Sequence, residues 1–371
     1  MINSHALRAT VNGVACSHAL RATVNGVAAT PSHKLRKFTG PRGERGVALI
    51  IALILVALAA ILATKLTFDG FLERRRAIGV LAAEQALQFG MGAEALAADA
   101  LAQDLQNNQM TTLTGAWAQP TQPLPITPQD DPEGEPIGTL QGELEDMQGR
   151  FNLNNLGLLT PGTGPQGSST ATTEDPEALA QFQRLLVLVG VEPKWAALAR
   201  DWIDADDIAG NPDGAEDQIY TSQNPPYRTG NWPMLSASEL MNLPGFGADR
   251  YRKIAPYVTA LPTLTGRATT INICTAPAPV LESMADNLSG EYSAEALANG
   301  RKSGCFPPLD AFTNILGKSA GTLRGRFDTK SQYFRLTTRV TLGTTEFTLY
   351  SLLSRGPGGK ITPMLRSFGI P

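Results

Sequence analysis

The feature that most constrains this chain is an uninterrupted apolar run of seventeen residues from Val47 to Ala63. A helix of about seventeen to twenty residues spans most of a hydrocarbon core that is about 30 Å thick. Charged residues flank the run on both sides, which argues against the buried helix of a soluble protein. A secretory signal peptide would end in a small-residue cleavage site followed by a change in composition, and the chain shows neither. The sequence therefore predicts a retained transmembrane helix over residues 47–66.

The helical pattern continues well beyond the membrane segment. No proline occurs between Pro41 and Pro120, and small or apolar residues recur every three or four positions from Val80 to Leu105. We predict one helix from Val47 to about Gln106, with its first third in lipid and its last half packed on a globular domain.

Charge is divided unevenly along the chain. Residues 1–46 hold seven Lys or Arg and one Glu, so the rest of the chain holds 24 basic and 33 acidic residues. Basic residues before a membrane helix hold that end in the cytoplasm, which places the body in the periplasm. An acidic body repels phosphate backbones, so we expect no nucleic acid partner.

Histidine is confined to the N-terminal region, because all three histidines lie before residue 46. The body therefore has no Ser-His-Asp triad, no Cys-His pair and no zinc site built on histidine. We expect that the protein is not an enzyme.

The segment before the apolar run, Arg42-Gly43-Glu44-Arg45-Gly46, resembles the cleavage site of type IV prepilins and pseudopilins. In that family a prepilin peptidase cuts after the glycine, the new N-terminus is methylated, and the anchor stays in the inner membrane. The resemblance implies cleavage between Gly46 and Val47, loss of the basic leader 1–46, and a single-pass inner-membrane protein.

The fifth residue of the predicted mature chain is Ile51, where most of that family has Glu. That carboxylate is thought to neutralise the N-terminal ammonium of a neighbouring subunit, because an unpaired charge in hydrocarbon is costly. Its absence resembles the K class of minor pseudopilins in type II protein secretion. A subunit that lacks this carboxylate does not need another subunit above itself in the filament. The resemblance thus implies a position at the filament tip, with I- and J-type minor pseudopilins as partners.

Several segments of the body resemble the K class in the same order. They are DMQGRFNLNNL (146–156), DWIDADDIAGNPDGAEDQIY (201–220), PYRTGNWPMLSASELMNLPGFG (226–247) and TTINICTA (269–276). The resemblance covers nearly the whole chain from Gly46.

The predicted fold is α+β: a long transmembrane and spine helix, a pilin-like α/β scaffold with an antiparallel sheet, and an inserted all-helical domain. Alternation and β-branched residues predict an antiparallel meander over 333–342, 346–353 and 361–368, and extended segments near 142–154 and 269–274. The expected boundaries are the leader 1–46, the transmembrane helix 47–66, the spine helix and first scaffold part 67–165, the inserted domain 166–265, and the remaining scaffold 266–371.

The inserted domain carries a dense acidic segment between Asp201 and Asp217, which also includes Asp207. Hard oxygen ligands at this density suit calcium, although the spacing is not that of an EF-hand, and the family resemblance also favours calcium. A solvated acidic loop with helix caps is the alternative, and a carboxylate-pair hydrolase is a weaker one. The candidate calcium ligands are Asp201, Asp204, Asp206, Asp213, Glu216 and Asp217.

The segment from Leu243 to Asp249 resembles the turn of a helix-hairpin-helix, which presents backbone amides to DNA phosphates. From Asp201 to Pro262, however, four basic residues accompany nine acidic ones, so we expect a structural turn. The alternatives to a pseudopilin are therefore a membrane-tethered DNA-binding module and a type IV pilus minor pilin.

Cys274 and Cys305 are the only cysteines of the predicted mature chain. An even pair on the oxidising side of the membrane favours a disulfide, and two buried free thiols are the alternative.

Overall fold

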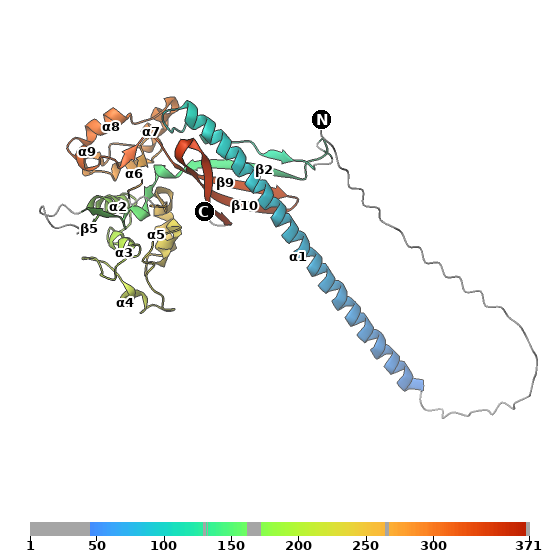
Figure 1. Ribbon diagram of the computed structural model, residues 1–371. Coiled ribbons are helices and arrows are strands. Elements are labelled where there is room, and N and C mark those ends of the chain that lie inside the picture. The colour runs from blue at the N-terminus through green and yellow to red at the C-terminus, as the bar shows by residue number, and fades with distance from the viewer. Residues whose placement is uncertain (1–44, 129–130, 132, 162–171, 264–266, 369–371) are drawn as a thin grey trace, which may run out of the picture. The chain divides into compact units, whose positions relative to one another are not determined.

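The computed structural model describes residues 45–128, 131, 133–161, 172–263 and 267–368 (Figure 1). The chain divides into two units, Met1–Gly70 and Phe71–Pro371, which are considered separately below. Most of the predicted leader lies outside the described residues.

Helix α1 runs without interruption from Arg45 to Asn107, as the sequence predicts. Within the described residues it is the one helix long and apolar enough to cross a membrane. Its most apolar stretch buries no residue, and Val47 and Ile51 are more than half exposed. A core helix of a soluble protein would bury such side chains, so this stretch suits a single-pass membrane anchor.

A five-stranded antiparallel sheet forms the scaffold of the second unit (Figure 1). The predicted meander is confirmed as β9 (Tyr333–Leu342), β10 (Thr345–Arg355) and β11 (Ile361–Phe368). Two earlier strands complete the order β1-β2-β9-β10-β11, namely β1 (Leu124–Ile126) and β2 (Gly138–Asp146). β2 pairs with β9 from Gly138↔Leu342 to Asp146↔Phe334, which joins the two ends of the scaffold sequence.

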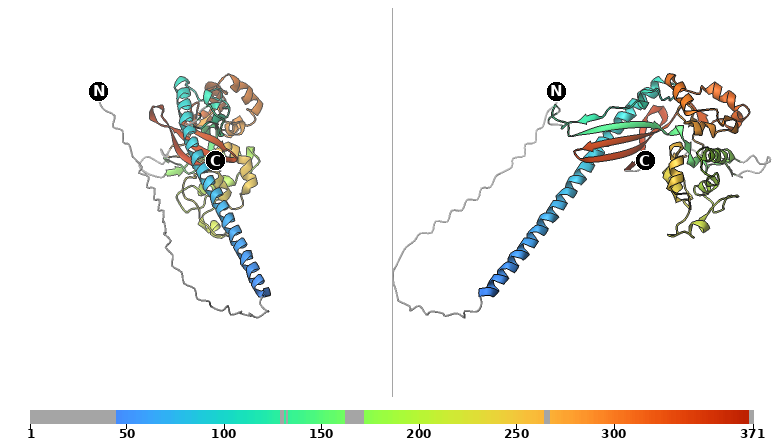
Figure 2. Two further views of the ribbon diagram at one scale, coloured as in Figure 1. Left: turned by 90° about the vertical axis from the view of Figure 1, so that its right-hand side faces the viewer. Right: turned by 180° about the vertical axis from the view of Figure 1, so that it is seen from behind.

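The C-terminal half of α1 packs on one face of this sheet (Figure 2). Leu101 and Leu105 lie in one apolar cluster with Phe334 and Leu353 of the sheet. Trp117, from the 3-10 turn Ala116–Ala118, closes the cluster by meeting the Phe334 ring edge-on at a centroid distance of 5.3 Å. The stripe predicted from Val80 to Leu105 therefore faces the sheet only at its C-terminal end, because Val80 and Met91 are exposed.

Among the described residues, eight shorter helices form a lobe in two sequence blocks, which Figures 1 and 2 draw in green to yellow and in orange. The first block holds α2 (Pro176–Leu188), α3 (Trp195–Asp201), α4 (Asp217–Tyr220) and α5 (Gly247–Ile254). The second holds α6 (Ala278–Glu282), α7 (Ala294–Gly300), α8 (Leu309–Leu316) and α9 (Ser319–Thr322). The lobe also contains a short antiparallel pair, β4 (Leu159–Pro161) and β5 (Thr172–Glu174).

Both blocks share one hydrophobic core. Phe151, Phe182 and Leu240 from the first block are in the same buried cluster as Ile273 and Phe312 from the second. Segment 271–323 thus packs with the helical lobe, whereas the sequence suggested that residues 266–371 belonged to the scaffold.

The start and the end of each block pair with each other as a two-residue parallel ladder. β3 (Phe151–Asn152) pairs with β6 (Val258–Thr259), and β7 (Ile271–Asn272) pairs with β8 (Phe327–Asp328). Of the extended segments expected near 142–154 and 269–274, the first is divided between the end of β2 and β3, and the second is reduced to β7. The first is broken after Asp146, because its carboxylate accepts the N–H of Gln148 at 2.9 Å and caps the 3-10 turn Met147–Gly149.

Candidate calcium site

The acidic segment forms an irregular loop between α3 and α4 that is closed by Asp201. This buried carboxylate accepts hydrogen bonds through one oxygen from the N–H groups of Gly210 and Ala215, at 2.9 and 2.8 Å. A Cβ atom at Gly214 would lie 2.2 Å from that same oxygen, so the close approach of the loop to Asp201 requires glycine there. Asp201 therefore organises the loop.

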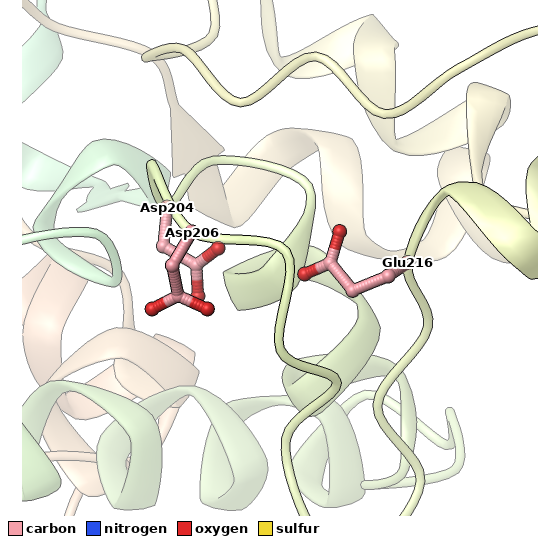
Figure 3. Close-up of side chains that lie close together, drawn as sticks. All are labelled: Asp204, Asp206 and Glu216. Atoms are coloured by element: carbon pink, nitrogen blue, oxygen red, sulfur yellow. The ribbon is translucent and has the colours of Figure 1, made fainter.

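Three of the predicted ligands converge inside this loop (Figure 3). Asp204 and Asp206 come from its first turn and Glu216 from its end, and one oxygen of each lies within 4.8 Å of the others. Asp204 and Glu216 are buried, whereas Asp206 is exposed. The cluster is thus half-open to solvent, which would let water complete the coordination of an ion.

The electrostatics of Glu216 fit a cation. Both of its oxygens are buried and accept no hydrogen bond from any described residue. Burial, followed by the negative charges of Asp204, Asp201, Asp206 and Asp207, raises the pKa of Glu216 to about 7. A buried carboxylate without donors, facing other carboxylates, is unfavourable unless a positive charge joins it. Three hard oxygen donors, one of them exposed to water, match the preference of calcium.

The other predicted ligands lie outside this cluster. Asp217 accepts hydrogen bonds from Arg228 Nη1 at 2.9 Å and from the N–H and hydroxyl of Thr229 at 3.1 and 3.0 Å. Asp213 is exposed and occupies the left-handed region with φ 71°. The six predicted ligands therefore divide into a converging trio, two carboxylates that organise the loop, and one that faces solvent.

The asparagines of the 146–156 segment fasten the lobe, a role the sequence did not reveal. Asn152 exchanges hydrogen bonds with both backbone groups of Leu261, at 2.8 and 3.2 Å. Asn154 does the same with Met234, at 2.7 and 2.9 Å, and Asn155 with Thr269, at 2.9 and 3.1 Å. We call Asn152, Asn154 and Asn155 the asparagine clamp. Their only sequence signal was the NLNN run itself.

A buried carboxylate joins the scaffold to the second block. Besides capping its own turn, Asp146 accepts hydrogen bonds from Asn272 at 2.9 Å and from the Thr275 and Ser331 hydroxyls at 2.7 Å each. Burial raises the pKa of Asp146, although these donors lower it in part. Because these bonds cap its own turn and join distant chain segments, the role of this carboxylate is structural.

In the turn that resembles a helix-hairpin-helix, the side chain of Arg250 binds groups of this protein itself. Arg250 donates to both Glu192 oxygens, at 2.9 and 3.1 Å, and to the carbonyls of Gly245 and Phe246. Gly245 and Gly247 both adopt positive φ, which shapes the turn. These contacts support the structural interpretation over phosphate binding.

Comparison with known proteins identifies the family. Two family models match, over residues 149–263 and 271–330, and both are described as type II secretion system (T2SS), protein K. The two matches correspond closely to the two blocks of the lobe. Type II secretion system protein K of Pseudomonas aeruginosa is 33% identical over 341 residues, covering 88% of this chain and 94% of that protein. The chain belongs to the type II secretion system protein K family.

Two further similarities support membership of the protein K family. The protein of that name from Aeromonas hydrophila is 30% identical, covering 88% of this chain and 98% of the relative. A solved chain from the GspK-GspI-GspJ complex of enterotoxigenic Escherichia coli aligns with a TM-score of 0.66 at 26% identity. The alignment covers 80% of this chain and 100% of that one. The protein is thus a minor pseudopilin, and the DNA-binding and type IV pilin alternatives are not favoured.

This protein K family member also forms the disulfide predicted between Cys274 and Cys305. The bond joins the segment after β7 to the segment before α8 and closes 31 residues of the second block. It therefore fastens α6 and α7 to the junction with the scaffold.

Proposed function

We propose that this protein K family member is a non-enzymatic subunit at the tip of the type II secretion pseudopilus. Its anchor helix would lie in the inner membrane, with its body in the periplasm. The observation that carries the proposal is the start of α1, where Ile51 occupies the position of the usual family carboxylate and no acidic residue occurs from Val47 to Ala63.

The electrostatic argument for the tip is asymmetric. A subunit without a carboxylate at Ile51 cannot neutralise the N-terminal ammonium of a subunit placed above it in hydrocarbon. Its own ammonium can still be received by the Glu of a subunit below it. Such a subunit begins a filament and does not lengthen one.

The same proposal includes cleavage of the leader by prepilin peptidase and assembly with other minor pseudopilins. The Gly46–Val47 bond lies in the first turn of α1, so cleavage by prepilin peptidase would leave the membrane segment whole. The similar Escherichia coli chain was solved with GspI and GspJ. We therefore propose I- and J-type minor pseudopilins as partners of this protein.

Calcium would act on the loop between α3 and α4 in this proposal. Asp204, Asp206 and Glu216 would hold the ion, which would relieve the repulsion among them. The ion would then order the loop on the first block of the lobe. The chain's own residues supply the ligands and the loop closure through Asp201, and the ion supplies the missing positive charge.

The tip assignment is tested by locating the full-length protein in filaments made with its partner subunits. Immunogold labelling of an epitope-tagged chain should mark one filament end, and overproduction of this chain alone should give no filaments. Ile51→Glu should allow labelling along the shaft, whereas Ile51→Leu, a matched apolar change, should leave the label at the end. Regular labelling along the shaft by the unaltered chain would show that the assignment is wrong.

A further inference from the structure

A large basic cleft lies between the lobe and the sheet of the second unit. Its volume is about 1190 Å³, and it is lined by residues 267–270, the segment 322–333, and the end of β10. The charged side chains of the lining are Asp175, Arg267, Arg324, Arg326, Asp328, Lys330 and Arg355.

Most of these cations have no counter-ion among the described residues. Arg326 Nη2 lies 2.6 Å from the buried Asp175 carboxylate, which satisfies both groups. The side chains of Arg267, Arg324, Lys330 and Arg355 form no hydrogen bond or ion pair with any other described residue. Asp328, the remaining carboxylate, accepts the N–H of Thr329 at 2.7 Å. The cleft therefore holds an uncompensated positive charge.

This positive charge is unexpected in an acidic body. Residues 47–262 contain 12 basic and 26 acidic residues, whereas residues 263–371 contain 12 basic and 7 acidic ones. The cleft is lined mainly by this basic C-terminal part. Concave walls of low dielectric constant focus the field of such a cluster and raise the local concentration of anions.

We propose that the basic cleft binds an extended, acidic segment of a partner protein. Its volume exceeds the roughly 300–1,000 Å³ of small-molecule pockets, and its cations come from three separate chain segments. Guanidinium groups bind carboxylates in bidentate fashion, so Arg267, Arg324 and Arg355 can each engage a separate Asp or Glu.

A short peptide suits this protein better than a nucleic acid. Charges interact over about 8 Å at physiological ionic strength, so a few carboxylates inside the cleft experience mainly its local cations. A long phosphate chain would extend beyond the cleft onto the acidic part of the body, which repels it. This inference goes beyond the proposed tip function and does not depend on it.

The test measures binding to the detergent-solubilised full chain by fluorescence anisotropy. The probe is a fluorescein-labelled octapeptide that alternates Glu and Gly, and its control replaces each Glu by Gln. We expect saturable binding of the Glu peptide that weakens as salt increases, and no saturation with the Gln peptide.

Matched double variants locate the binding to the cleft. Arg324→Glu with Lys330→Glu should weaken binding at least about tenfold, because two attractive charges become repulsive. Arg252→Glu with Lys318→Glu changes the net charge equally at exposed positions outside the cleft, and should alter affinity less than about twofold. Circular dichroism checks the fold of each variant, and Arg324→Gln with Lys330→Gln provides a milder substitute if the reversal disturbs folding.

Three results would overturn the proposal. The first is the absence of saturation by up to millimolar Glu peptide at low salt. The second is an equal loss of affinity in both double variants, which would indicate a response to net charge alone. The third is tighter binding of a twelve-nucleotide single strand, or of vesicles rich in phosphatidylglycerol, that depends on the same cleft residues.

Discussion

Glu94 on α1 and Arg366 on β11 form a bidentate ion pair, with Nε to Oε1 and Nη2 to Oε2 distances of 2.8 and 2.7 Å. Glu94 is buried, and it also accepts a hydrogen bond from the Ser351 hydroxyl of β10. One carboxylate on α1 therefore holds the last two strands of the sheet. These contacts complement the apolar packing of Leu101 and Leu105 on the same face.

Glu94→Gln should destabilise the sheet in a pH-dependent manner. Burial raises the pKa of Glu94, but hydrogen bonds from Arg366 and Ser351 lower it by more, so the pKa lies below its usual value. The stabilisation is present above the unfolded-state pKa of about 4.5 and is lost as pH falls through the lower folded-state value. Thermal unfolding of the full chain should show a loss of about 1–3 kcal/mol at pH 7 that vanishes in acid. Glu346→Gln, at an exposed position on β10, is the control and should show no such change.

Glu216→Gln should have opposite effects with and without calcium. In chelator, the variant should melt higher than the parent, because it removes a buried charge that faces other carboxylates. With calcium in about hundredfold excess over its dissociation constant, the parent should gain about 2.7 kcal/mol, and the variant should lose most of that gain. Asp213→Asn, in the same loop but outside the trio, should behave like the parent. An unaltered melting temperature of the parent after addition of chelator would exclude the site.

Processing should leave Val47 as the first residue. Intact-mass analysis of membrane-extracted protein should fit residues 47–371 plus one N-terminal methyl group. Gly46→Arg should retain the leader, because a bulky charged side chain replaces the residue that the peptidase is expected to require. Retention of residues 1–46 in the unaltered protein, or an N-terminus elsewhere, would contradict this prediction.

Asn154→Asp should destabilise the protein strongly, although the two side chains have nearly the same size and shape. The amide donates to the carbonyls of Met234 and Leu261, at 2.9 and 3.0 Å, and a carboxylate would place oxygen against oxygen there. We expect a loss of about 2 kcal/mol or more, measured by chemical denaturation at pH 7, because the buried carboxylate keeps only the Met234 N–H as a donor and its second oxygen faces two carbonyls. Asn299→Asp, on the exposed end of α7, should change stability by less than about 0.5 kcal/mol. Equal stability of both variants would mean that the asparagine clamp does not fasten the lobe.

The accuracy of prediction from sequence depended on the length and periodicity of each element. Strands β9 and β10 bury alternate residues over most of their length, which sequence periodicity detects, and helix α1 was marked by its continuous apolar run. Helices α6 to α9 have four to eight residues each, so no clear period could develop in them. Two-residue strands such as β3 and β7 depend on tertiary pairing and leave no local pattern.

The candidate calcium site was also predicted only in part from the sequence. Acidic density located the loop, but Asp201, Asp204 and Asp217 look alike in sequence. Their roles differ because backbone N–H groups surround Asp201, Arg228 and Thr229 reach Asp217, and Asp204 faces Glu216. Such distinctions depend on contacts made by residues up to fourteen positions away, which composition cannot encode.

The shared core of the two blocks sets an order for folding during synthesis. Phe151, Phe182 and Leu240 leave the ribosome before Ile273 and Phe312, which complete their apolar cluster. The first block therefore waits with part of its core uncovered until the second block has been made, even though the residues of both β3 and β6 have been synthesised by then. Only when Phe327 pairs with Ile271 is the second ladder formed. A nascent chain halted before that point would expose apolar surface, and quality-control proteases and chaperones act on chains of this kind.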